Sequence, residues 1–127
     1  MKNCPFCNTG LINDQRVVLS NETCLFLQTP QEILFGSGLI VPKKHRETLF
    51  DLSEDEWRDT YKLLSSVKEL LDQQCQPQGY NVGWNCGEVG GQHIFHAHLH
   101  VIPRYANEPF AGKGIRHWLK SEANRRL

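Results

Sequence analysis

The sequence lacks several features that would assign it to a broad class at once. Lysine and arginine together number 14, as do aspartate and glutamate, so the formal net charge is zero with neutral histidine. Without a basic excess, we expect neither a general nucleic-acid binder nor a membrane-surface binder. No apolar run approaches the length of about 18 residues that a membrane-spanning helix needs. No repeat, low-complexity tract or linker divides the 127 residues, which predicts one domain, 1–127.

Signals for secretion and for disulfide bonding are also absent. The first residues form no apolar signal stretch, which predicts a cytoplasmic protein. Five cysteines are an odd number, and disulfides are rare in a reducing compartment, so metal binding or free thiols are favoured. Cys24, Cys75 and Cys86 stand alone in the sequence, and we interpret them as small apolar residues.

One long helix is predicted from about residue 53. Ser53 and Glu56 have the spacing of a capping box, and Gln76-Pro77 predicts the end of the helix. Apolar side chains between these points recur at three- and four-residue steps, which predicts one buried stripe. Its members are Trp57, Tyr61, Leu64, Val67, Leu70 and Leu71. We expect Trp57 and Tyr61 to make core or dimer contacts.

Short apolar runs on both sides of this helix predict strands at 17–19, 24–27, 39–41, 80–84 and 94–102. Several strands around one long helix predict an α+β fold with a mainly antiparallel sheet. In the tail, residues 113–127, we expect one short helix with Trp118 docked in a core.

Histidines occupy every second position at 96, 98 and 100, and Ala97 and Leu99 fill the gaps. In a strand, alternate side chains share one face, so three imidazoles would project together. A solvated strand face or satisfied core histidines are the alternatives. Imidazole is a metal ligand, an acid or base near neutral pH, and a nucleophile, and we therefore expect a functional site.

The stretch just before these histidines is rich in glycine. Gly87, Gly90 and Gly91 follow Asn85 closely, and such turns can aim backbone N–H groups at an anion. A plain hairpin turn is the alternative. Because the stretch directly precedes the histidines, we expect a phosphate-binding loop.

Cys4 and Cys7 form a CxxC pair that can chelate one Zn²⁺ ion. A redox dithiol is the alternative, but that motif usually opens a helix after a buried strand. A closed tetrahedral site needs two more ligands, for which His45 and His96 are candidates.

These motifs together resemble the histidine-triad (HIT) superfamily. The run from His96 to Ile102 resembles the family signature of three alternating histidines, and Asn85 with Gly90-Gly91-Gln92 resembles its phosphate loop. The run from Ile40 to His45 resembles the strand before its long helix. The CxxC pair resembles the N-terminus of a zinc-bearing bacterial branch.

The resemblance implies an α+β fold with about five antiparallel strands, one long helix and a short C-terminal helix, usually in a homodimer. It also implies hydrolysis or transfer of nucleotidyl groups through a nucleotidyl-histidine intermediate. Dinucleoside polyphosphates such as diadenosine tetraphosphate are the first substrate class. Nucleoside phosphoramidates, or nucleotide binding without catalysis, are the alternatives.

Roles for individual residues follow from the same resemblance. His98 would be the nucleophile, and His100 would bind the phosphate. Asn85 would hold a phosphate or ribose oxygen beside Gly91, and Gln92 would lie near the leaving group. The zinc ligands would be Cys4, Cys7, His45 and His96, and four protein ligands make the ion structural because no position is left for water.

Two positions depart from the family pattern. His93 stands where a hydroxyl residue usually binds phosphate; it would replace that donor, act as general acid, or simply cap the strand. No carboxylate follows the second predicted strand, where Gln28 and Thr29 stand in place of a ribose-binding acid. Arg104 would pair with a phosphate or with a carboxylate.

Overall fold

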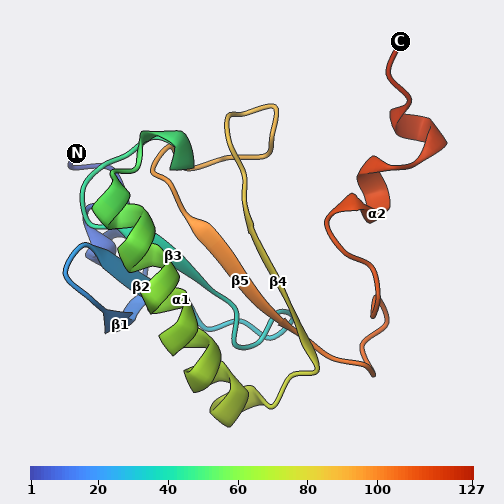
Figure 1. The fold of residues 1–127 in the computed structure, drawn as a ribbon, viewed down its shortest axis with the longest axis horizontal. Coiled ribbons are helices and arrows are strands. Elements are labelled where there is room, and N and C mark those ends of the chain that lie inside the picture. The colour runs from blue at the N-terminus through green and yellow to red at the C-terminus, as the bar shows by residue number, and fades with distance from the viewer.

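The computed structural model describes residues 1–127 and contains one five-stranded antiparallel sheet crossed by one long helix (Figure 1). The strands are β1 (Arg16–Ser20), β2 (Cys24–Gln28), β3 (Gly38–Pro42), β4 (Gly79–Trp84) and β5 (Leu99–Arg104), in the spatial order β1-β2-β3-β5-β4. The long helix is α1 (Glu54–Cys75), and a short helix α2 (Arg116–Leu119) lies in the tail. Single 3-10 turns occur at Thr9–Leu11, Leu49–Asp51 and Glu122–Asn124. The α+β fold with five strands is confirmed, and no helix has the length and apolar character to cross a membrane.

The ends of α1 agree with the sequence-based prediction. The Ser53 hydroxyl accepts a hydrogen bond from the Glu56 amide, and the Glu56 carboxylate accepts one from the Ser53 amide, which completes the capping box. At the other end Gln76 adopts a left-handed conformation with φ 44°, and Pro77 cannot continue the helix.

The buried stripe of α1 differs from the predicted one. The buried positions are Glu56, Thr60, Leu63, Val67 and Leu71. Trp57 and Tyr61 are 44% and 72% exposed. The apolar pattern misled because two polar residues take inward positions: Glu56 pairs with Arg46, and Thr60 contacts the Cys24 thiol. Neither aromatic residue is therefore a core residue of the chain.

The two faces of the sheet have different covers. Side chains that alternate along β2, β3 and β5 pack against α1 as the main core, which comprises Cys24, Phe26, Ile40, Leu63, Val67, Leu71, Leu99 and Val101. The opposite face carries a second, smaller cluster of Phe6, Leu27 and Val41. Phe6 belongs to the N-terminal segment, so that segment covers the side of the sheet away from α1.

The predicted strand at 94–102 is wrong in its first half, because β5 begins only at Leu99. The Ala97 amide donates to the carbonyl of Arg46, at 2.7 Å, instead of pairing with β4. β4 ends at Trp84, and the glycine-rich loop that follows turns back on itself, so no partner strand is present there. Only His100 of the three alternating histidines lies in the sheet.

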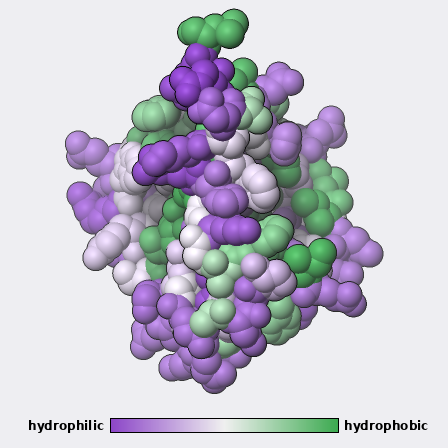
Figure 2. Space-filling view, turned by 90° about the vertical axis from the view of Figure 1, so that its right-hand side faces the viewer, coloured by the Kyte–Doolittle hydropathy of each residue, from purple (hydrophilic) through white to green (hydrophobic).

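The C-terminal tail is not docked in a core as expected. Ile115, Trp118 and Leu119 are each more than 60% exposed, and the tail extends away from the sheet (Figure 1). Figure 2 shows this side of the molecule, with hydrophobic side chains visible among hydrophilic ones. Arg104 anchors the start of the tail: its guanidinium contacts the Glu108 carboxylate at 2.9 Å and the carbonyl of Phe110 at 2.7 Å. The partner of Arg104 is thus a carboxylate.

Candidate active site and metal centre

Residues 42–47, between β3 and α1, hold the segment that carries the histidines. Three backbone carbonyls of this stretch accept hydrogen bonds of 2.7 or 2.8 Å from the segment at residues 92–97. The pairs are Pro42 with the His96 ring, Arg46 with the Ala97 amide, and Glu47 with the Gln92 side chain. The segment is therefore fixed without belonging to the sheet.

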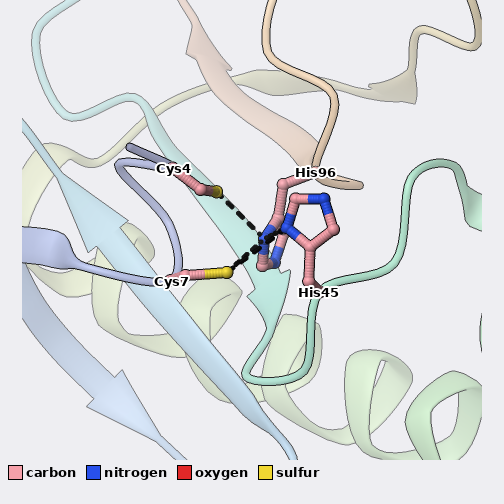
Figure 3. A group of neighbouring side chains, drawn as sticks. All are labelled: Cys4, Cys7, His45 and His96. Carbon is pink, nitrogen blue, oxygen red and sulfur yellow. Dashed lines mark hydrogen bonds between the residues drawn. The ribbon is translucent and has the colours of Figure 1, made fainter. Parts of the chain in front are cut away.

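Cys4, Cys7, His45 and His96 converge on one point beside this segment (Figure 3). One ligand atom from each lies within 4.8 Å of all the others. The Cys4 Sγ atom is 3.3 Å from His96 Nδ1, the Cys7 Sγ atom is 3.3 Å from His45 Nδ1, and the two Nδ1 atoms are 3.2 Å apart. The structure thus brings together all four residues expected to bind metal.

The donor set fits a tetrahedral zinc ion. Zinc–sulfur bonds of about 2.3 Å and zinc–nitrogen bonds of about 2.0 Å place neighbouring ligand atoms about 3.5 Å apart. Four of the six separations are 3.2 to 3.5 Å and match that spacing, and all six lie within 4.8 Å. His96 Nε2 donates to the Pro42 carbonyl at 2.8 Å, which leaves the Nδ1 lone pair for a metal. Burial lowers the pKa of His96, which favours the neutral ring that a metal requires.

His98 is buried directly beside this cluster. Its Nδ1 atom lies 2.8 Å from the carbonyl oxygen of His96, so Nδ1 carries the proton and donates it. Its Nε2 atom makes no hydrogen bond with the protein and keeps a free lone pair. Burial lowers the pKa of His98, with the hydrogen bond to the His96 carbonyl opposing the change. The result is a neutral imidazole with one available nitrogen, as nucleophilic attack requires.

His100 lies next to His98, with ring centroids 5.0 Å apart. In the sheet it pairs with Leu39 of β3 and Gly83 of β4. Its Nε2 atom is the only buried side-chain nitrogen or oxygen in the chain without a hydrogen-bond partner. Burial, followed by the nearby His98 ring, lowers the pKa of His100. A buried polar atom without a partner is costly, and a ligand oxygen would satisfy it.

Asn85 and His100 line the same cavity, which has a volume of about 240 Å³. Asn85 is exposed and its amide makes no hydrogen bond within the protein, so it is available to a ligand. The remaining lining residues are Asn81, Gly83, Trp84, Ile102 and Ile115. A second cavity of about 260 Å³ also reaches His100, and its polar lining is uncharged: Gln15, Thr29, Gln31 and Ser37. Thr29 therefore lines a cavity that reaches His100.

Most amides of the glycine-rich loop form hydrogen bonds within the loop itself. The amides of Gly90 and Gln92 both donate to the Gly87 carbonyl, at 3.1 and 3.0 Å, and the Gly91 amide donates to the Glu88 carbonyl. These amides, together with that of Gly87, which donates to the Gln92 side chain, are therefore not free for the expected contact with an anion. Gly87 and Gly91 have φ values of 78° and 96°, so glycine is needed here for the backbone path.

Gln92 also differs from the expectation that it contacts a leaving group. The side chain is 1% exposed, and its oxygen accepts from the Gly87 amide at 2.9 Å. Its nitrogen donates to the carbonyls of Glu47 and Ile94, at 2.7 and 3.0 Å. All of this bonding is internal, so Gln92 holds the loop in place. His93 is exposed and forms no hydrogen bond within the protein.

Sequence reasoning missed two residues of the site. Phe6 is 2% exposed, and its ring lies 5.2 Å from the His98 ring. Phe6 stands between Cys4 and Cys7 in the sequence, and this position could have indicated that it lies near the site. Ile115 of the tail lines the cavity that contains Asn85, and it meets β4 at Gly83, where an added Cβ would lie 3.1 Å from its Cδ1. No pattern in the sequence marks that contact.

The five-stranded sheet, the alternating histidines and the Cys/His cluster that could hold a metal agree with the expected histidine-triad class. The chain belongs to the HIT family, because residues 11–107 match the sequence model of the HIT domain. Protein hit of Bacillus subtilis is 30% identical over 106 residues, which cover 82% of this chain and 72% of that protein. A crystal structure of a HIT family protein from Bacillus anthracis has a TM-score of 0.73 at 31% identity, covering 83% and 75% of the two chains.

Several of the similar proteins carry a named activity. Adenosine 5'-monophosphoramidase hnt1 of Schizosaccharomyces pombe is 32% identical over 79 residues, which cover 62% of this chain and 56% of that protein.

Proposed function

We propose that the chain is a nucleotide hydrolase or nucleotidyltransferase in which His98 is the nucleophile. The unpartnered, buried Nε2 of His100 beside the free Nε2 of His98 carries this proposal. His100 Nε2 lacks a hydrogen-bond partner, which a ligand oxygen would supply, and His98 Nε2 can form a covalent bond. A phosphoryl group between the two nitrogens would serve both.

The chemistry proceeds in two displacements. His98 Nε2 attacks the α-phosphorus and forms a P–N bond, while the bond to the leaving group breaks and its electron pair departs with that group. Water then attacks the same phosphorus and loses a proton to solvent, the P–N bond breaks, and its electron pair returns to Nε2. The Nδ1 proton stays on His98 and remains hydrogen-bonded to the His96 carbonyl throughout, which stabilises the ring while it carries positive charge. His100 Nε2 and the Asn85 amide stabilise the phosphoryl oxygens.

Dinucleoside polyphosphates are the proposed substrate class. Their leaving group is a nucleoside polyphosphate, which departs as a stable anion and needs no strong acid. Because burial lowers the pKa of both His98 and His100, the site holds neutral rings and no buried acid. A zinc ion held by Cys4, Cys7, His45 and His96 would be structural, since four protein ligands would leave no open position for the substrate.

Nucleoside phosphoramidates are the second candidate, favoured by the similarity to the phosphoramidase from Schizosaccharomyces pombe. An amine leaving group needs a proton, and the exposed ring of His93 would supply it. Two substrates, diadenosine tetraphosphate and an adenosine phosphoramidate, are compared in wild type and in His93→Ala. Their hydrolysis rates separate the two candidate substrate classes. Phosphoramidate turnover that exceeds polyphosphate turnover and depends on His93 would replace the first candidate.

A covalent intermediate separates catalysis from passive nucleotide binding. The protein is mixed with substrate, quenched with base and analysed by intact mass spectrometry. We expect one added nucleotidyl group in the wild type and none in His98→Ala. Nucleotide binding without this mass shift in either protein would reject the nucleophile and leave a binding module.

We propose that Cys4, Cys7, His45 and His96 hold one structural zinc ion. The support is the spacing of the donor atoms and the hydrogen bond from His96 Nε2 to the Pro42 carbonyl. All five cysteines are free thiols, which agrees with a reduced site and with the proposed cytoplasmic location. Elemental analysis of protein purified without chelator should find one zinc per chain, and absence of a transition metal would overturn this.

We also propose that the chain forms a homodimer through α1 and the edge strand β4. Trp57 and Tyr61 are exposed on α1, and the Trp57 ring lies 6.0 Å from that of Trp84 on β4. β4 pairs only with β5, so its outer edge is open to a second copy. Light scattering should give twice the chain mass for wild type and the chain mass for Trp57→Glu. Trp118→Glu, on the tail, is the matched control and should remain dimeric.

A further inference from the structure

The ring of Phe6 lies against the proposed nucleophile although Phe6 belongs to the metal-binding turn. Its centroid is 5.2 Å from the His98 ring, with 60° between the planes, and 5.7 Å from the His96 ring at 86°. Phe6 is 2% exposed and packs with Leu27 and Val41 on the face of the sheet away from α1. One aromatic side chain thus contacts a metal-binding histidine and the nucleophile together.

The His98 ring is held from three sides. Its Nδ1 atom donates to the carbonyl of His96, the His100 ring lies at a centroid distance of 5.0 Å, and the Phe6 ring lies at 5.2 Å. Rotation of the imidazole by half a turn would exchange Nδ1 with Cδ2 and Nε2 with Cε1, which would break the hydrogen bond to the His96 carbonyl and move the free nitrogen. Without that bond, neither neutral tautomer of His98 would be favoured. The Phe6 ring packs against His98 and would oppose this rotation.

The segment that carries Phe6 has few other attachments. Residues 1–12 belong to no strand, and their backbone hydrogen bonds join only residues within the first fifteen. The side chain of Gln15 adds bonds to the carbonyls of Pro5 and Thr9, which are also local. The segment is therefore attached to the sheet by the burial of Phe6 and by the cluster that Cys4 and Cys7 form with two distant histidines.

We propose that Phe6 is a positioning residue for His98, held in place by the metal-binding turn, and that metal occupancy controls the orientation of the nucleophile through it. This inference rests on the proposed function of His98. Metal loss would free the turn, withdraw Phe6 and leave the imidazole able to rotate. Activity would then depend on zinc even though zinc never contacts the substrate.

The test uses Phe6→Leu, which keeps an apolar side chain but removes the ring. Phe26→Leu is the matched control, because Phe26 is equally buried but packs under α1 in the other core cluster. We expect Phe6→Leu to bind one zinc per chain and to lose about 10-fold in kcat with little change in KM, as a misplaced reacting group does. Phe26→Leu should lose thermal stability and keep its kcat. Equal kcat values in the two variants would overturn the proposal.

A second measurement does not require turnover. Long-range proton–nitrogen NMR spectra of the histidine rings distinguish the two neutral tautomers. His98 in the zinc-loaded wild type should show only the form protonated at Nδ1, whereas Phe6→Leu and chelator-treated wild type should show both forms. A single His98 tautomer after complete zinc removal would reject the coupling.

The two measurements separate this inference from the proposed function. An inactive wild type whose His98 tautomers respond to Phe6 and zinc would reject the hydrolase and keep the positioning role. An active wild type whose His98 tautomers do not respond to Phe6 or zinc would keep the hydrolase and reject the positioning role. Should Phe6→Leu fail to fold, the chelator titration of the wild type decides the question alone.

Discussion

The carbonyl oxygen of His96 accepts a hydrogen bond from Nδ1 of His98 at 2.8 Å. The ring of His96 belongs to the Cys/His cluster, and its backbone carbonyl selects the tautomer of His98. The Nε2 atom of His96 is fixed in turn by the Pro42 carbonyl, so the chain of contacts runs from β3 through the cluster to the candidate nucleophile. The Cys/His cluster and the candidate nucleophile are consequently one connected unit.

Replacing His100 should separate stability from activity. The Nε2 atom of His100 is buried without a partner, so His100→Leu should keep the free energy of unfolding or raise it by about 1 kcal/mol. Turnover should fall by about 100-fold or more, because a donor to the phosphoryl oxygens is lost. Urea denaturation and steady-state kinetics measure the two effects. A variant that is clearly destabilised would show that His100 Nε2 has a partner in the folded protein.

Asn85 and Gln92 carry similar amides but should respond in opposite ways. Gln92→Ala leaves the Gly87 amide and the carbonyls of Glu47 and Ile94 without partners, and should cost about 2–4 kcal/mol of unfolding free energy. Asn85→Ala removes an exposed side chain, should change stability by less than about 0.5 kcal/mol, and should lower activity at least about 10-fold. Similar stability losses in both variants would contradict these assignments.

Removal of the cysteine ligands should lower stability as well as activity. We expect Cys4→Ser combined with Cys7→Ser to lose the zinc and to lower the Tm by at least about 5 °C, because metal binding contributes to the free energy of folding. Cys86→Ser is the control, since Cys86 lies outside the cluster, and it should keep one zinc per chain. Zinc retained by the double variant would show that the metal binds elsewhere.

Glu56 should give the protein a stability that depends on pH. Burial alone would raise the pKa of Glu56, but hydrogen bonds from the Ser53 amide and from Arg46 outweigh it and hold the pKa below its usual value. A carboxyl with a lowered pKa stabilises the fold above the unfolded-state pKa of about 4.3, and this contribution is lost as the pH falls through the lower folded-state value.

Glu56→Gln should therefore lower the unfolding free energy by about 1–3 kcal/mol at pH 7, and by much less below pH 4 or so. Denaturation curves across this range provide the measurement. Glu54→Gln, exposed in the same helical turn, is the control and should change stability by less than about 0.5 kcal/mol at any pH. A Glu56→Gln deficit that persists undiminished in acid would assign the effect to packing instead.

Local patterns predicted most of the secondary structure correctly. The capping box of Ser53 and Glu56 marked the start of α1, and Pro77 marked its end, because both act through the backbone of adjacent residues. The alternation in β5 was correct from Leu99 onward and failed before it. Pairing requires a partner strand, and the loop after β4 removes that partner by folding back on Gly87.

Prediction of the buried stripe failed for a different reason. Hydrophobicity placed Trp57 and Tyr61 inward, yet Glu56 and Thr60 occupy those positions because Arg46 and Cys24 offer them partners. Those partners lie on other elements, so no window of the helix sequence contains the information. The same holds for the amide of Gln92, whose three bonds include one to the distant Glu47.

The sequence alone determined which chemical groups are available: two thiols at chelating spacing, alternating imidazoles, and glycines that permit a left-handed turn. These depend on residue type and on distances of a few positions along the chain. Only the tertiary structure decided how each group is used, because hydrogen bonds and burial across the sheet select the inward side chains and the protonated nitrogen. It turned the Gln92 amide into a loop support, left the His100 nitrogen unpartnered, and placed Phe6 against His98.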